Sequence, residues 1–221
     1  MTRRFELQGH RGARGLFPEN TLEGFAATLA LGVDSIELDV AVTRDGVAVV
    51  THDPVLNPDI ARGPDGRWLD GPGPAIRSLS FAELAAYDVG RLRPGSRLAG
   101  LYPDQAPVDG ARIPRLADVL ALVAGCGVVV DAELKTMPDQ PDLTVSPAEM
   151  GDAVLACARE AGALDRLVVR SFDWRGLAHL RAACPELRLA WLTSRDTPPA
   201  LWWGVPDADA GRDAPACVHR A

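Results

Sequence analysis

Hydrophobic residues recur along the chain at two spacings, which predict strands and helices in alternation. Residues 5–10 and 35–42 are short apolar segments typical of strands, and the second carries acidic residues. Between them, residues 21–32 have apolar positions at helical spacing. Asn20 is the expected N-cap, and Glu23 completes a capping-box pattern. The chain therefore begins with a predicted strand–helix–strand unit.

The same alternation continues in the second half of the chain. Beyond residue 115 we expect helices at 116–125, 146–163 and 173–184, and strands at 128–135, 167–172 and 187–193. Ser146 followed by Pro147 marks the start of the longest helix. With a further strand at 47–53, the sequence predicts six strands. Their alternation with helices indicates a parallel α/β fold, either a (β/α) barrel or a doubly wound sheet.

One block interrupts this regularity. Residues from about 54 to 114 are rich in Gly, Pro and Arg and contain a single helical stretch at 80–90. The block lacks the apolar periodicity that a core of its own requires. We therefore interpret it as an insertion after the third strand of one domain spanning residues 1–221. Residues 194–221, rich in Asp, Ala, Gly and Pro, are expected to form an irregular tail.

Composition narrows the class of partner and the compartment. The chain of 221 residues is 47% hydrophobic with a net charge of −7, which argues against nucleic acid or an anionic membrane surface as the main partner. No apolar run is long enough to span a bilayer and no signal peptide is recognisable, so we expect a cytoplasmic protein. The four cysteines favour neither a zinc site nor disulfides, because they are widely spread: Cys126, Cys157, Cys184 and Cys217.

Acidic residues within two of the apolar strands are the main functional signal. Glu37 and Asp39 are two residues apart, so both project from the same face of a strand, as do Asp131, Glu133 and Lys135. Unpaired carboxylates in such an interior are costly. Lys135 balances one charge, and a divalent cation is the simplest further partner; an all-oxygen ligand set suits Mg²⁺ or Ca²⁺. The alternative is that these acids pair with arginines at strand ends.

Histidines follow two of the predicted strands. His10 and His52 end neighbouring strands beside the acids, and histidine titrates near neutral pH, so the pair can divide the roles of general acid and general base. Arg11 follows His10 directly, and its planar fork suits a phosphate, although pairing with one of the acids explains it equally well. His179 and His219 lack such a setting and are interpreted as structural.

Several separated motifs resemble one known enzyme family. They are HRGARGLFPENT at residues 10–21, IELDV at 36–40, VVTHDP at 49–54, IPRLADVL at 113–120, AELK at 132–135 and SF at 171–172. In order and spacing they resemble the glycerophosphodiester phosphodiesterase family, up to about residue 192. The resemblance implies a TIM-type (β/α) barrel with an insertion after the third strand.

The resemblance also implies an activity and a site. Seven residues receive roles: metal ligation by Glu37, Asp39 and Glu133, acid/base catalysis by His10 and His52, and phosphate contact by Arg11 and Lys135. The implied reaction is metal-dependent hydrolysis of a small-molecule glycerophosphodiester to an alcohol and sn-glycerol 3-phosphate. Two alternatives stay open: a lysophospholipase D-like activity, and an inactive member of the family that binds only metal or a partner.

Two departures from the family pattern qualify these expectations. Asp131 stands where the family commonly has Asn, and its added negative charge is expected to tighten the metal or to require an extra cation. The family's last two strands have no recognisable counterpart after residue 192. We therefore expect a C-terminally shortened barrel that lacks the last two βα units and offers an open edge through which copies could oligomerise.

Overall fold

The protein is built around one sheet of mostly parallel strands. The computed structural model describes residues 5–137 and 139–194. The strands are β1 (Gln8–His10), β2 (Ser35–Val42), β3 (Ala48–Val50), β4 (Val129–Leu134), β5 (Leu167–Ser171) and β6 (Arg188–Trp191). The helices are α1 (Leu22–Ala30), α2 (Phe81–Leu84), α3 (Arg97–Leu101), α4 (Leu116–Leu122), α5 (Pro147–Glu160) and α6 (Trp174–Ala183), with short 3₁₀ turns at Ile76–Ser78 and Leu164–Arg166.

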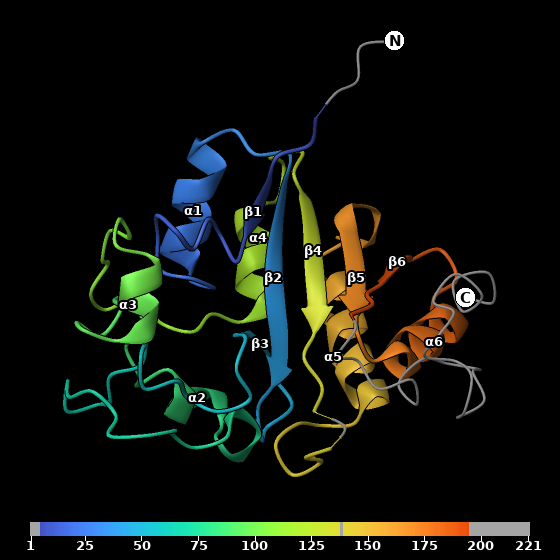
Figure 1. Ribbon diagram of the computed structural model, residues 1–221. Helices are drawn as coiled ribbons and strands as arrows, with labels where there is room; N and C mark the ends of the chain where they lie inside the picture. The colour runs from blue at the N-terminus through green and yellow to red at the C-terminus, as the bar shows by residue number, and fades with distance from the viewer. Residues whose placement is uncertain (1–4, 138, 195–221) are drawn as a thin grey trace.

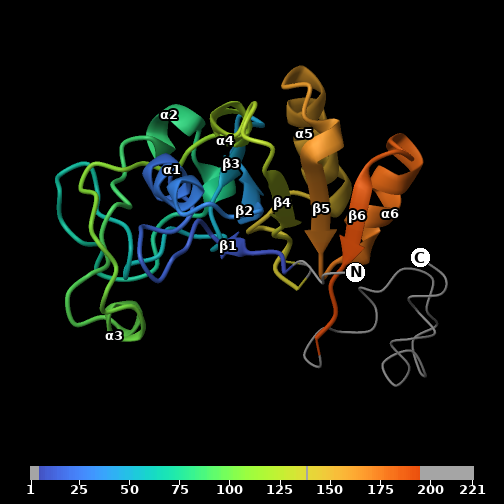
Figure 2. The ribbon, with the colours of Figure 1, turned by 90° about the horizontal axis from the view of Figure 1, so that it is seen from above.

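The main wall of the sheet is parallel, in the order β1-β2-β4-β5-β6 (Figure 1). Helices α1, α4 and α5 lie behind these strands, as the view from above shows (Figure 2), and α6 packs against α5, β5 and β6. Within the described residues the wall is open, because no strand joins β6 to β1. The arrangement confirms the predicted parallel α/β fold of TIM type.

Strand β2 shows how the sheet separates core from site. All eight of its residues are buried. Ile36, Leu38 and Val40 are fully buried in the main hydrophobic core, together with Phe25 of α1 and Trp174 of α6. Because side chains alternate along a strand, the odd-numbered residues of β2 face the opposite side, where its acids lie. One face of the strand therefore holds the fold together while the other carries polar groups.

Strand β3 differs from the prediction. It pairs antiparallel with β2 and lies off the parallel wall, so that wall has five strands in the described part of the chain, against six predicted. The physical reason is the connection. The turn between the two strands is tight: Gly46 has φ +80° and donates its N–H to Thr43 O at 3.0 Å. A parallel neighbour would need a crossover of a dozen or more residues.

The block that follows β3 shares a second, smaller core with the hairpin. Leu56, Ile76 and Leu84 of the block cluster with Ala41 of β2 and Val49 of β3. Helix α2 falls within the stretch predicted to be helical, whereas the five-residue α3 was not predicted. The hairpin of β2 and β3 thus packs against the block, while β2 also belongs to the parallel wall.

The predicted N-cap is correct for α5 and wrong for α1. For α5, Ser146 is the N-cap, Pro147 opens the helix, and a full capping box with Glu149 is present, as predicted. For α1 the predicted N-cap was wrong: Thr21 caps the helix and accepts a hydrogen bond from Gly24 N. Asn20 instead adopts a left-handed backbone with φ +55°, and its side chain turns to the polar face of β2.

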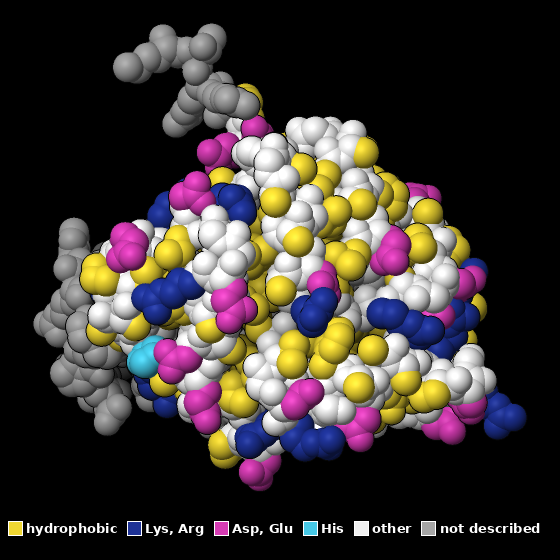
Figure 3. All heavy atoms as spheres, turned by 180° about the vertical axis from the view of Figure 1, so that it is seen from behind, with side chains coloured by type: hydrophobic (Ala, Val, Ile, Leu, Met, Phe, Trp, Pro, Cys, Tyr) yellow, Lys and Arg dark blue, Asp and Glu magenta, His cyan; other side chains and the backbone are white. Residues whose placement is uncertain are grey.

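The remaining surface adds few functional signals. From behind, basic and acidic side chains are interspersed over the helical face with hydrophobic atoms between them (Figure 3). Among the described residues, no helix has the length and apolar character needed to cross a membrane. Cys126, Cys157 and Cys184 are free thiols, and His179 pairs with Asp152 at the surface. The tail beyond Ser194, with Cys217 and His219, lies outside the described residues.

Candidate active site

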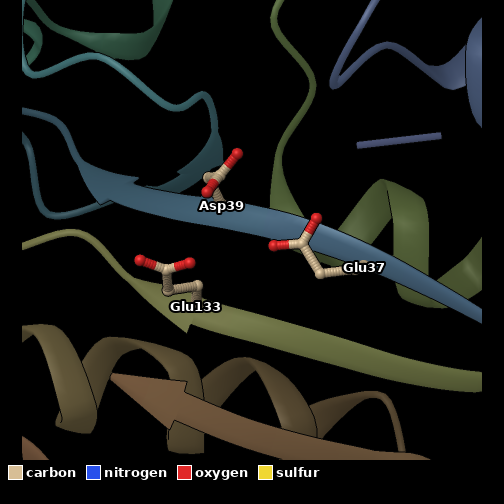
Figure 4. A group of neighbouring side chains, drawn as sticks. All are labelled: Glu37, Asp39 and Glu133. Carbon is tan, nitrogen blue, oxygen red and sulfur yellow. The ribbon is translucent and has the colours of Figure 1, made fainter. Parts of the chain in front are cut away.

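Three carboxylates meet on the polar face of β2 and β4. Glu37 and Asp39 come from β2 and Glu133 from β4, and the register pairs Asp39 directly with Glu133. One carboxylate oxygen from each residue lies within 4.8 Å of those of the other two (Figure 4). Glu37 and Asp39 are buried and Glu133 is half-buried. Two adjacent strands thus fix a compact, oxygen-only group of potential metal ligands.

The three carboxylates do not share the same electrostatic environment. Burial, together with the charges of Asp39 and Glu133, raises the pKa of Glu37 to about 7. Burial acts in the same direction on Asp39, but Lys135 and Arg11 outweigh it and hold the pKa of Asp39 below its usual value. Glu37 is therefore the member of the trio with the weakest cationic support from the protein.

Two basic side chains border the trio. Lys135 Nζ donates to Glu133 Oε1 at 2.6 Å and lies 3.2 Å from Asp39 Oδ1. Arg11 Nε lies 3.1 Å from Asp39 Oδ2, and its Nη1 donates to Glu19 Oε1 at 3.0 Å. The backbone N–H of Arg11 also donates to Glu37 Oε2 at 3.0 Å. The pairing of arginine with a strand acid, one of the two interpretations left open from the sequence, is thus present for Arg11.

The two predicted histidines have different surroundings. His10 Nε2 lies 3.8 Å from Glu37 Oε2, and the side chain is 61% exposed. Partial burial and the neighbouring Arg11 and Arg14 lower the pKa of His10. His52 lies two residues beyond the end of β3, and its Nδ1 is 2.7 Å from Asp53 Oδ1.

Asp53 is held in turn by the first residues of the inserted block. Asn57 Nδ2 donates to Asp53 Oδ2 at 2.6 Å, so Asp53 bridges His52 and Asn57. Burial alone would raise the pKa of Asp53, but the hydrogen bonds from His52 and Asn57 outweigh it and lower that pKa. An ionised Asp53 accepts the proton of His52 Nδ1, which leaves Nε2 as the ring nitrogen available for proton exchange.

The loop between β1 and α1 adopts an unusual backbone. Arg11, Ala13 and Asn20 have φ values of +52°, +53° and +55°, a conformation that side chains other than glycine seldom adopt. Asn20 stabilises the loop by donating from Nδ2 to Asp39 Oδ2 at 2.9 Å, and its N–H donates to Arg11 O at 3.0 Å. Sequence reasoning assigned Asn20 to capping and missed its contact with a site carboxylate.

The inserted block also contacts this loop. Arg14 donates to the hydroxyl of Tyr102 from Nε at 2.6 Å and also from Nη2, and its guanidinium lies 4.6 Å from the ring centroid. Gln105 Nε2 donates to Arg14 O at 2.7 Å. Arg14 Nη1 lies 3.7 Å from Glu19 Oε2, and Glu19 binds Arg11. A continuous series of contacts therefore joins Tyr102 to Arg11, a connection between distant residues that no local sequence signal indicates.

The extra acid Asp131 has its own cation. Asp131 forms an ion pair with Arg170 of β5 and accepts from Gln8 Nε2 at 3.1 Å. The register places Arg170 opposite Glu133 and Asp131 opposite Glu37. The predicted need for an extra cation is thus met by Arg170, which sequence reasoning missed. Its position two residues before the end of a predicted strand, on the same face as the acids of the adjacent strand, was the available signal.

A pocket of about 310 Å³ opens next to this group. His52, Glu133 and Lys135 line it together with Phe172 and Met137. It lies at the carboxyl ends of β4 and β5, where parallel α/β folds commonly place their ligands. All seven residues predicted for the site therefore lie either in the carboxylate group and its bordering contacts or along this pocket.

Comparison with known proteins places the chain in a family. The family model described as the glycerophosphoryl diester phosphodiesterase family matches residues 10–215. The chain belongs to this family. The match confirms the resemblance to this family that the motifs at 10–21, 36–40 and 132–135 indicate.

Individual members of the family show how far the similarity extends. A crystal structure from Silicibacter pomeroyi DSS-3, of a candidate glycerophosphoryl diester phosphodiesterase, superposes with a TM-score of 0.82 at 41% identity, over 87% of this chain and 66% of that one. A glycerophosphodiester phosphodiesterase of Caldanaerobacter subterraneus is 27% identical over 83% of this chain and 64% of its own. The chain thus spans about two thirds of the length of these relatives.

A third member was crystallised with a bound product. This phosphodiesterase from Oleispira antarctica, in complex with the product sn-glycerol-3-phosphate, has a TM-score of 0.65 at 25% identity, over 86% of this chain and 66% of that one.

Proposed function

We propose that the protein is a metal-dependent glycerophosphodiester phosphodiesterase that releases an alcohol and sn-glycerol 3-phosphate. The observation that carries the proposal is the carboxylate trio of Glu37, Asp39 and Glu133, bordered by Arg11 and Lys135. Membership of the family supports the same reaction, as does the product complex of the Oleispira antarctica relative.

The trio fits a hard divalent cation. Its three donors are carboxylate oxygens, which suit Mg²⁺ or Ca²⁺ and do not favour zinc. The charges agree as well: the four carboxyl groups of Glu37, Asp39, Asp131 and Glu133 outnumber the three cations that border them, Arg11, Lys135 and Arg170. An excess of acidic groups favours a bound cation. When bound, the cation supplies charge stabilisation to the phosphoryl group.

The remaining chemistry falls to side chains of the chain. Arg11 binds a phosphate oxygen, which requires its guanidinium to share contacts with Asp39 and Glu19. His52, oriented through Nδ1 by Asp53, protonates the leaving alkoxide from Nε2. His10 takes the proton of the nucleophile, and its lowered pKa keeps it neutral and able to accept that proton near pH 7. The nucleophile is water, which gives sn-glycerol 3-phosphate directly, or the glycerol 2-hydroxyl, which gives a cyclic phosphodiester that water then opens to sn-glycerol 3-phosphate.

Turnover measured on defined diesters tests the proposal. The protein with Mg²⁺ or Ca²⁺ should release sn-glycerol 3-phosphate from glycerophosphocholine, and EDTA should abolish the release. His10→Ala and His52→Ala should each lower kcat by roughly 10²–10⁴-fold, because each removes a proton-transfer group. The matched control His179→Ala, which alters a surface histidine paired with Asp152, should leave kcat within about twofold.

Two results would contradict this assignment. EDTA-insensitive turnover would exclude the metal. Release of lysophosphatidic acid from lysophosphatidylcholine, without turnover of glycerophosphocholine, would favour the lysophospholipase D-like alternative.

A further inference from the structure

The pocket next to His52 is placed to receive the alcohol part of the diester. In the proposed reaction His52 protonates the leaving alkoxide, so the alcohol lies on the His52 side of the phosphate. The pocket of about 310 Å³ is lined by His52 and by residues at the carboxyl ends of β4 and β5, among them Met137 and Phe172. Its chemical character therefore bears on which alcohol the protein prefers.

Thr136, Ser171 and Asp173, three polar residues that line the pocket, already have hydrogen-bond partners. Thr136 donates its hydroxyl proton to Asp173, and Ser171 donates to Leu134 O. Asp173 also forms a two-pronged ion pair with Arg175, which compensates its charge. A polyhydroxy alcohol bound here would find carboxylate acceptors, but no side-chain hydroxyl of the pocket with a proton left to donate.

The charge of the pocket favours a cation. Lys135 lines the pocket and forms ion pairs with Glu133 and Asp39. Asp53 pairs with His52 and accepts a hydrogen bond from Asn57; among the described residues no arginine or lysine forms an ion pair with it, and it stays ionised. A carboxylate with spare lone pairs at the pocket wall attracts a positive group and repels an anionic one.

The walls add apolar and aromatic surface. Phe172, Met137 and Pro54 are half-buried and line the pocket. An aromatic face attracts a cation, and an alkylated ammonium gains contact with all three side chains without requiring hydrogen-bond partners.

We propose that this pocket selects a diester whose alcohol carries an N-alkylated ammonium group, in preference to polyhydroxy or anionic alcohols. The inference rests on the proposed function for the orientation of the diester. Phe172 is assigned as a residue that determines specificity, through contact of its ring with the ammonium group.

A comparison of substrates tests the proposal. The protein should have a kcat/KM for glycerophosphocholine at least about tenfold above that for glycerophosphoinositol, and glycerophosphoserine should be poorer still. Phe172→Leu keeps apolar volume but removes the ring, so the choline-to-inositol ratio should fall roughly three- to tenfold. Met137→Lys adds a positive charge and should lower the ratio further. The matched control Phe81→Leu, in α2 of the inserted block, should leave the ratio unchanged.

Direct binding separates this proposal from the proposed function. Calorimetry with choline alone should detect binding that Phe172→Leu weakens and that inositol does not show. Binding of choline without turnover of any diester would overturn the proposed function and leave the pocket assignment standing. Turnover with equal kcat/KM on choline and inositol diesters, or a Phe172→Leu protein that loses activity equally on both, would overturn the assignment of the pocket.

Discussion

The carboxylate trio and Arg11 are held in the candidate site by different kinds of structure. Glu37, Asp39 and Glu133 are carried by adjacent strands whose backbone hydrogen bonds fix their register. Arg11 instead lies on a loop with a left-handed backbone and depends on side-chain contacts from Glu19. Glu19 is in turn approached by Arg14, which Tyr102 of the inserted block holds. The geometry of the proposed metal ligands is set by the sheet, whereas that of Arg11, the proposed phosphate-binding residue, is set by tertiary contacts.

This difference predicts two kinds of mutational response. A change in a strand acid removes one proposed metal ligand without disturbing the backbone that carries the others. Activity and metal affinity should therefore fall while the fold stays intact. A change in the contacts around the loop should leave the chemistry intact and reduce the fraction of time that Arg11 is placed for binding.

The largest effect is expected from a strand acid. Glu133→Gln preserves shape but removes a negative charge and leaves Lys135 with Asp39 as its carboxylate partner, so kcat/KM should fall by about 10²–10³-fold and Mg²⁺ affinity should drop. The measurements are steady-state kinetics and calorimetric metal titration. The control Glu160→Gln removes an exposed charge at the end of α5 and should change neither. Full activity in Glu133→Gln would show that the strands do not supply the ligands.

An intermediate effect is expected on stability without metal. The raised pKa of Glu37, about 7 against an ordinary 4.5, means that the folded state holds a proton more tightly than the unfolded chain. Its contribution to stability is fully present below pH 4.5 and is lost as pH rises through 7. Between pH 5 and 8 the free energy of unfolding of the wild type should therefore fall by about 2.5 kcal/mol relative to Glu37→Gln.

Urea denaturation in EDTA at several pH values measures this difference. Adding Mg²⁺ at pH 8 should restore the stability of the wild type and not that of Glu37→Gln, because a bound cation offsets the charge of Glu37. If the difference in free energy of unfolding between the wild type and Glu37→Gln stayed constant with pH, the raised pKa of Glu37 would be contradicted.

The smallest effect is expected in the connection to the loop. Tyr102→Phe keeps the ring beside Arg14 but removes the hydroxyl that accepts its hydrogen bonds. KM should rise roughly three- to tenfold with kcat within about twofold, because binding of the phosphate weakens while acid/base chemistry is unchanged. Trp68→Phe, which alters another arginine–aromatic contact in the block, serves as control. A fall in kcat at unchanged KM would place Tyr102 in the chemical step instead.

Features set by strand periodicity or by local capping signals could be predicted from the sequence, whereas contacts between distant side chains could not. The period of two along the strands was enough to place Glu37 beside Asp39, and adjacent parallel strands brought Glu133 to them. Helix α5 was also predictable, because Ser146 and Pro147 encode its start locally. The contact between Tyr102 and Arg14 joins residues 88 positions apart, and no pattern of spacing encodes it.

The direction of β3 could not be predicted from its hydrophobic pattern. Its apolar composition matched that of a buried parallel strand, and only the short connection after β2 distinguishes it. The role of Asn20 was missed for a related reason. Asn is common both at helix caps and in left-handed turns, and the choice between Asn20 and Thr21 as cap follows from the contact of Asn20 with Asp39.

The placement of β3 outside the parallel wall has a consequence for how members of this family can diverge. Val50 donates its N–H to Pro114 O at 2.9 Å, and Val49 is bridged to Arg115, so the inserted block leaves and re-enters the fold at one point. Lengthening, shortening or exchanging the segment between these anchors need not alter the order or register of the parallel strands. The segment between these anchors can thus vary in length while the strands that carry Glu37, Asp39 and Glu133 keep their register.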